Sequence, residues 1–137
     1  QVSEEAMRLI ETTKNSLDAA IAVVKSGNRL GDIGAAVQEY AESRGYGVVR
    51  EYVGHGIGRN LHEEPQIPNY GVAGRGALLH AGMVIAIEPM VNVGTWRTQA
   101  LEDGWTVVTA DGKLSAHFEH TMAIGEHGAE VLTLLKD

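Results

Sequence analysis

A histidine flanked by glycines is the first feature of this sequence that could support chemistry. His55 lies between Gly54 and Gly56, and Gly58 follows shortly after. Glycines remove side chains around the imidazole, which permits unusual backbone angles and the close approach of another group. The alternative interpretation is a glycine-rich turn that carries an incidental histidine. The segment alone leaves both interpretations open.

A glutamate at the end of an apolar run is the second such feature. Glu88 follows Ile85, Ala86 and Ile87 directly. A carboxylate in apolar surroundings is unfavourable unless it is paired or bound to a metal. Pro89 has no N–H to donate to a sheet, so we expect the strand to be interrupted where Glu88 lies.

A second carboxylate lies in residues 116–124, which read as a strand. Side chains alternate between the two faces of a strand, so His117, Glu119 and Thr121 share one face. Phe118, His120 and Met122 share the other. For this strand in isolation, Glu119 would be a solvated surface residue and His120 a core histidine with its hydrogen bonds satisfied.

The three segments together favour a metal site. His55, Glu88 and Glu119 lie on or beside separate strands and offer one imidazole nitrogen and two carboxylates. This set suits Mn, Fe(II), Co or Zn better than Ca. His62 follows His55 by seven residues, and from there it could donate a hydrogen bond to a substrate carbonyl.

Composition limits the class of protein. The 137 residues, 44% of them hydrophobic, fit one globular domain spanning residues 1–137. A net charge of −7 gives no support for binding nucleic acid, and the absence of cysteine excludes a thiolate site. No run approaches the roughly 18–20 apolar residues of a membrane span. We therefore expect a cytoplasmic protein that does not enter membranes.

The first third of the chain is predicted to form two amphipathic helices. One begins after Ser3 and ends at Gly27, with an apolar face that includes Met7, Ile10 and Leu17. The other spans residues 30–44 and ends at Gly45. The spacing of the apolar residues in both helices predicts faces that pack against the rest of the protein, and it indicates no catalytic or binding role.

Strands make up the remainder of the chain. We predict them over residues 46–52, 83–93, 105–109, 114–124 and 131–135, with a turn at Asp111 and Gly112. Residues 59–81 are rich in Gly, Pro and Asn and are predicted to be a functional loop. Two helices before several strands indicate an α+β fold, with the helices on one face of a mainly antiparallel sheet.

Three motifs in this order resemble the signatures of type I methionine aminopeptidases. They are GHGIGRNLHEEP from Gly54, GMVIAIEPM from Gly82 and DGWTVVTADGKLSAHFEHT from Asp103. The resemblance covers nearly the whole chain and implies the pita-bread fold shared with prolidase, aminopeptidase P and creatinase. Met90 and the Glu63-Glu64-Pro65 run are similar to the methionine-specific branch.

The resemblance also implies roles for individual residues. His55, Glu88 and Glu119 would bind metal, with Glu119 bridging two ions, and Glu88 would also carry a proton. His62 would stabilise the scissile carbonyl, and Trp105 would line the pocket for methionine. Leu61 stands where the family usually has Phe, so one wall of that pocket would be smaller. Two metal ions would together lower the pKa of water and polarise the peptide carbonyl.

The family's complete site has two further ligands, both aspartates, which come from an amino-terminal half. None of the aspartates of this chain lies in the family's aspartate motifs; they are Asp18, Asp32, Asp103, Asp111 and Asp137. The chain therefore resembles the carboxy-terminal half of the catalytic domain. We expect at most one metal ion and little peptidase activity from this chain alone. We also expect self-association unless a separate chain supplies the missing half.

Several functions remain open at this stage. The first is metal-dependent removal of methionine from the amino termini of peptides and nascent proteins, with the missing half present. The second is a non-catalytic binding module, and the third is an isolated half-fold. An X-Pro peptidase would be separated from the first by comparing Met-Ala with Ala-Pro peptides.

Overall fold

The computed structural model describes residues 1–136 and begins with two helices. Helix α1 spans Glu4–Ile21 and helix α2 spans Leu30–Glu42. The hydroxyl of Ser3 accepts a hydrogen bond from the Ala6 N–H at 3.1 Å, as expected for a residue that starts a helix. Both helices end before the predicted glycines, since Ala22 and Ser43 already cap them.

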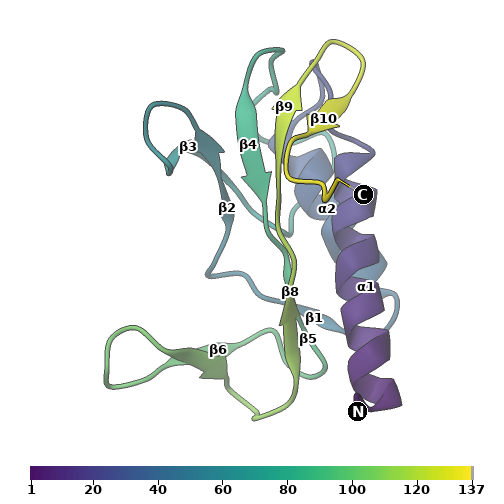
Figure 1. Ribbon diagram of the computed structural model, residues 1–137, viewed down its shortest axis with the longest axis vertical. Coiled ribbons are helices and arrows are strands. Elements are labelled where there is room, and N and C mark those ends of the chain that lie inside the picture. Colours follow the sequence, from purple (N-terminus) through teal and green to yellow (C-terminus); the bar gives the residue numbers. More distant parts are fainter. Residues whose placement is uncertain (137) are drawn as a thin grey trace.

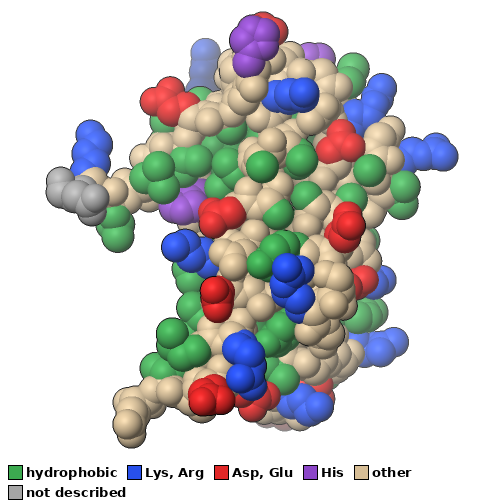
Figure 2. All heavy atoms as spheres, turned by 90° about the vertical axis from the view of Figure 1, so that its right-hand side faces the viewer, with side chains coloured by type: hydrophobic (Ala, Val, Ile, Leu, Met, Phe, Trp, Pro, Cys, Tyr) green, Lys and Arg blue, Asp and Glu red, His purple; other side chains and the backbone are tan. Residues whose placement is uncertain are grey.

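The packing face of α1 differs from the prediction. Leu9, Leu17 and Ala20 are buried, whereas Met7 and Ile10 are 54% and 38% exposed. Thr13 and Ser16 are buried instead, because each hydroxyl donates to a helix carbonyl and needs no water. Figure 2 shows the face that carries α1, where acidic and basic side chains alternate with apolar ones. This mixture is typical of a solvent-facing helix.

Ten short strands follow within residues 1–136, and every pairing between them is antiparallel. A five-stranded sheet has the order β10-β9-β4-β2-β3, a three-stranded sheet the order β1-β5-β8, and β6 and β7 form a hairpin. The bounds are β1 Gly47–Val48, β2 Gly54–Ile57, β3 Glu63–Ile67, β4 Val84–Ile87, β5 Met90–Asn92, β6 Thr98–Ala100, β7 Val107–Thr109, β8 Ser115–His117, β9 His120–Ile124 and β10 Ala129–Val131.

Several predicted strands are wrong in extent. The strand predicted over residues 46–52 is reduced to β1, and the last strand ends at Val131 and not at residue 135. The strand predicted over 114–124 is split in two, whereas the split of the strand over 83–93 follows the predicted interruption. Strand β3 lies inside the predicted loop 59–81, and β6 was not predicted. The expected α+β class, with helices on a mainly antiparallel sheet, is confirmed.

The helices cover one side of the sheets (Figure 1). Helix α1 contacts β5 and β8, and α2 contacts β1 and β3. Between the layers lies one core that includes Leu17, Ile33, Ile85, Ile87 and Met122. The β6–β7 hairpin projects from the opposite side (Figure 1). Neither helix in the described residues is long and apolar enough to cross a membrane.

Candidate metal centre

Two aligned strand breaks bring the glutamates of the candidate site together. Strand β4 ends at Ile87, which pairs with His120 of β9, and β5 begins at Met90, which pairs with His117 of β8. Glu88 and Glu119 therefore lie at the same level, in the two gaps between the paired segments. The interruption predicted at Glu88 is confirmed, and it has a counterpart at Glu119.

His55 reaches this level from the neighbouring strand β2. It pairs with Ala86 of β4 and Gln66 of β3, and the register shifts between His55 and Gly56. The glycines beside it allow strands to approach closely, as predicted. A side chain at Gly54 would meet the Ala86 carbonyl oxygen at 2.2 Å, and one at Gly56 would meet the Glu64 carbonyl oxygen at 2.3 Å. Neither has a positive φ, so the predicted unusual backbone angles are absent at both positions.

Gly54→Ala is expected to destabilise the fold by about 1–3 kcal/mol, because the added methyl group must push β2 away from β4. The same displacement would move His55 and weaken metal binding. Thermal unfolding and metal titration of the variant would measure both effects. Gly128→Ala is the matched control, since nothing lies within 4 Å of its added methyl group. Equal unfolding temperatures for the two variants would contradict the close-approach explanation.

The three predicted ligands form one compact cluster. His55, Glu88 and Glu119 each offer a ligand atom, and these atoms all lie within 4.8 Å of one another. The Nε2 atom of His55 is 3.3 Å from Oε1 of Glu88. The side chains of His55 and Glu88 are only 12% and 16% exposed, whereas Glu119 is exposed. Within residues 1–136, no other group of His, Asp or Glu meets the same criterion.

The orientation of His55 fits metal binding. Its Nδ1 atom lies 3.0 Å from the Gly56 carbonyl oxygen, which accepts a hydrogen bond when the proton of the ring is on Nδ1. In that tautomer the lone pair of Nε2 is directed toward the carboxylates. A ligating histidine commonly donates its other ring N–H to a carbonyl in this way. One imidazole and two carboxylates are a ligand set for Mn, Fe, Co or Zn.

A second histidine at the cluster was not assigned a role from the sequence. Nε2 of His117 lies 3.5 Å from Oε2 of Glu88. The hydrogen bond to Glu88 raises the pKa of His117, and the charges of Glu88 and Glu119 add to this rise while partial burial opposes it. Strand alternation had placed His117 on the same face as Glu119, and this was the one feature of the sequence that could have indicated its place at the cluster. Its contact with Glu88 depends on how the two strand breaks align.

The predicted substrate residues occupy different parts of the structure. The His62 ring centroid is 4.1 Å from that of His55, at an angle of 41° between planes, and His62 is exposed. Leu61, beside it, is 69% exposed. Trp105 lies between β6 and β7 and is 88% exposed. His62 thus lies beside His55, while the predicted roles of His62, Leu61 and Trp105 toward the substrate stay predictions.

The described aspartates have other partners or lie on the surface, as the sequence led us to expect. Asp32 accepts hydrogen bonds from the N–H groups of Arg29 and Gly74, which lower the pKa of its carboxyl group. Asp103 accepts from Thr106 and Trp105, and Asp111 from Lys113 and Thr95, and the pKa of each is also lowered by these bonds. Asp18 is exposed on α1, and Asp137 lies outside the described residues.

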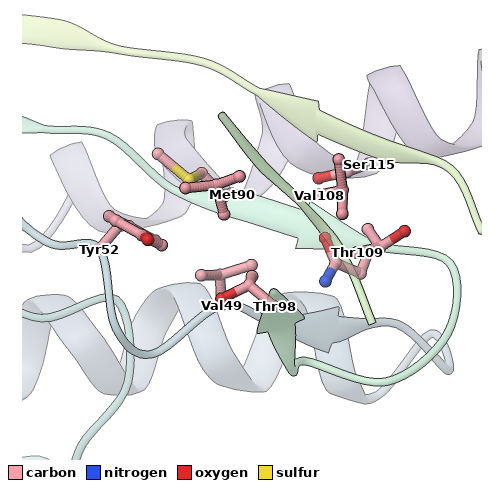
Figure 3. A pocket seen from close by; sticks show the side chains of 9 residues that line it. Val49, Tyr52, Met90, Thr98, Val108, Thr109 and Ser115 are labelled. Atoms are coloured by element: carbon pink, nitrogen blue, oxygen red, sulfur yellow. The ribbon is translucent and has the colours of Figure 1, made fainter. Parts of the chain in front are cut away.

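An apolar cavity is lined in part by residues of β6 and β7 (Figure 3). Its volume is about 240 Å³, and Met90, two residues after Glu88, forms part of its wall. Figure 3 shows Tyr52 and Met90 on one side and Val108 and Thr109 on the other. The cavity could accept a small apolar group near the carboxylates.

Comparison with known proteins gives consistent results. The model of metallopeptidase family M24 matches residues 1–126. A methionine aminopeptidase of Clostridium perfringens is 57% identical over 135 residues, which cover 98% of this chain and 54% of that protein. The crystal structure of methionine aminopeptidase from Rickettsia prowazekii matches with a TM-score of 0.96 and 48% identity, over 98% of this chain and 54% of that one.

A proline-peptide relative is more distant. Prolidase from Pyrococcus furiosus matches with a TM-score of 0.75 and 25% identity, over all of this chain and 35% of that one. The expected similarity to the methionine aminopeptidase branch is therefore confirmed, as is the expected half of the pita-bread fold. The chain spans about half the length of the relatives it matches.

Proposed function

We propose, since this chain belongs to metallopeptidase family M24, that it contributes half of an aminopeptidase that removes methionine from the amino termini of peptides and nascent proteins. The observation that carries the proposal is the cluster of His55, Glu88 and Glu119. Its side chains are of the types that a divalent metal needs. Methionine aminopeptidases that are 57% and 52% identical to this chain over 135 and 132 aligned residues support the choice of substrate.

His55, Glu88 and Glu119 would hold the metal. The ion, as Mn, Fe, Co or Zn, would act as a Lewis acid toward the peptide carbonyl and make water more acidic. The proposed complete site holds two ions, with Glu119 between them. The part of the relatives that this chain does not span would supply the remaining ligands. These residues alone would hold at most one ion.

Other side chains would act on the substrate directly. His62 lies beside His55 and is exposed, so its ring can donate a hydrogen bond to the carbonyl oxygen as negative charge develops there. Glu88 would accept the proton that the attacking water loses and pass it to the leaving amine. Leu61 and Trp105 would contact the methionine side chain.

The proposed partners follow from the same reaction. The substrates are free amino termini of peptides and nascent proteins, which places the enzyme in the cytoplasm. The second half of the site would come from a segment joined to this chain or from a separate chain, with self-association as the alternative. The exposed apolar side chains of Val107, Val108 and Leu114 suit burial against such a partner.

Native mass spectrometry combined with a peptide assay tests this function. The chain would be measured with Mn or Co, alone and after fusion to the part of the Clostridium perfringens enzyme that it does not span. We expect at most one ion and little turnover for the chain alone. The fusion should bind two ions and release methionine from Met-Ala-Ser at least about 1,000-fold faster than the chain alone. This increase is a small part of the rate acceleration that enzymes typically provide over the uncatalysed reaction.

Two outcomes would contradict the proposal. A folded fusion that binds two ions and cleaves Ala-Pro peptides but not Met-Ala-Ser would reject the methionine specificity. A folded fusion that binds no metal would reject the catalytic function. That result would favour a non-catalytic binding module, for which the support is that no aspartate of residues 1–136 joins the cluster.

A further inference from the structure

The Glu88 carboxylate lies between two histidines. Its Oε1 atom is 3.3 Å from Nε2 of His55, and its Oε2 atom is 3.5 Å from Nε2 of His117. Each oxygen thus has its own imidazole neighbour. The two histidines differ in exposure. The side chain of His55 is 12% exposed, and that of His117 is 42% exposed.

The backbone sets this arrangement on both sides. Glu88 precedes Met90, and the register of β5 and β8 places His117 directly opposite Met90. The Glu88 carbonyl oxygen also faces Nδ2 of the buried Asn69 at 3.5 Å. The main chain at Glu88 is therefore held by its neighbours, while Nε2 of His117 is the imidazole nitrogen available to donate to its carboxylate, since Nε2 of His55 would bind the metal.

We propose that His117 is a positioning residue that holds Oε2 of Glu88 and thereby fixes the carboxylate with Oε1 directed toward His55 and the metal site. This inference rests on the proposed metal ligation by His55, Glu88 and Glu119. His117 itself is not a ligand in the proposal, because its Nε2 is engaged with the oxygen of Glu88 that lies away from His55.

A positioning role has a defined physical effect. A glutamate has three side-chain torsions, and ordering them opposes metal binding unless the carboxylate is oriented beforehand. Hydrogen-bond partners of ligating carboxylates supply this orientation, and their loss typically costs 10- to 100-fold in metal affinity. An exposed ion pair with no such role would contribute little to any measured property.

Cobalt binding to the 137-residue chain tests the proposal. Calorimetry would give the affinity for Co²⁺, and visible absorption of the bound ion would report its coordination geometry. We expect His117→Leu to bind Co²⁺ about 10- to 100-fold more weakly and with a changed spectrum. His117→Gln should remain within about threefold of the original chain, since its amide N–H can reach the same carboxylate oxygen.

Two further variants sharpen the test. His117→Asn keeps a polar surface residue but its amide is too short to reach Glu88, so it should behave like His117→Leu and replaces that variant if it does not fold. His127→Leu is the control, because His127 is exposed in the turn between β9 and β10. Its affinity and spectrum should equal those of the original chain.

The outcomes separate this inference from the proposed function. Cobalt binding by the original chain together with unchanged binding and spectrum in His117→Leu and His117→Asn would overturn the role of His117 alone. Equal losses in His117→Gln and His117→Leu, with lowered unfolding temperatures in both, would overturn it in favour of a structural role. No cobalt binding by the folded original chain would overturn this inference, whereas the proposed function would still stand if the fused enzyme bound two ions.

Discussion

Glu119→Gln is expected to weaken binding of Co²⁺ to this chain by more than about 100-fold, beyond the loss typical of an outer hydrogen-bond partner. The substitution replaces one of two carboxylates in a three-residue cluster with a neutral amide. Only His55 and Glu88 would then remain as ligands, with half of the negative charge. Calorimetric titration and native mass spectrometry would measure the affinity and the number of bound ions.

The fold should survive this substitution. Glu119 is exposed and lies in the gap between β8 and β9, outside the core. Glu130→Gln is a matched control, because Glu130 is an exposed glutamate of β10 that does not belong to the cluster. Its unfolding temperature and cobalt affinity should be unchanged. Equal cobalt affinities for the two variants would show that Glu119 is not a ligand.

His62→Ala is expected to lower the turnover of Met-Ala-Ser by the fused enzyme about 10²- to 10³-fold, which is the usual effect of removing one donor to a developing oxyanion. His62 is exposed and its ring lies 4.1 Å from that of His55, at the edge of the proposed metal site. Its loss removes a hydrogen bond to the substrate and no ligand. Steady-state kinetics with parallel metal analysis would measure the change.

The metal content distinguishes this role from ligation. The His62→Ala fusion should still hold two ions, because His55, Glu88 and Glu119 are intact. His80→Ala serves as the control, since His80 is an exposed histidine of the loop before β4 and is not in the cluster. If metal content and turnover fell together in His62→Ala while His80→Ala was unaffected, His62 would be a metal ligand or a residue that holds a ligand in place. That result would contradict its proposed role as a hydrogen-bond donor to the substrate.

The cluster of metal-binding residue types was accessible from the sequence only when its three segments were considered together. Glu88 interrupts an apolar run, whereas Glu119 taken alone fits a solvated surface residue. Motif spacing joined them to His55 before any contact was known. The structure brings all three together, which confirms that they could hold a metal ion. Their ligation of an ion stays a prediction.

The local structure around His55 was harder to predict. The glycines suggested a turn, yet Gly54 and Gly56 belong to strand β2 and serve the close approach of β4 and β3. Glycine has a low strand propensity, so the sequence pattern pointed away from a strand. The requirement for glycine comes from backbone in neighbouring strands, at Ala86 for Gly54 and at Glu64 for Gly56, which a local pattern does not contain.

The contact of His117 with Glu88 was missed for a related reason. Alternation predicts which face a side chain occupies, but the pairing of β5 with β8 decides which residue lies opposite. The strand over 114–124 was predicted without an interruption, which concealed the second break. The exposure of Met7 and Ile10 has a different origin, because Leu9 between them is buried and the helix therefore turns another face toward the core.

The two strand breaks separate the residues that fold this protein from those that would carry its chemistry. Ile85, Ile87 and Met122 beside the breaks are fully buried, whereas Glu119 within one of them is exposed. A lineage could therefore substitute the glutamate of the exposed gap while selection continued to preserve the core. Inactive descendants with an intact fold are accessible through few mutations, and a gene duplicate could acquire a binding role without first evolving a new architecture.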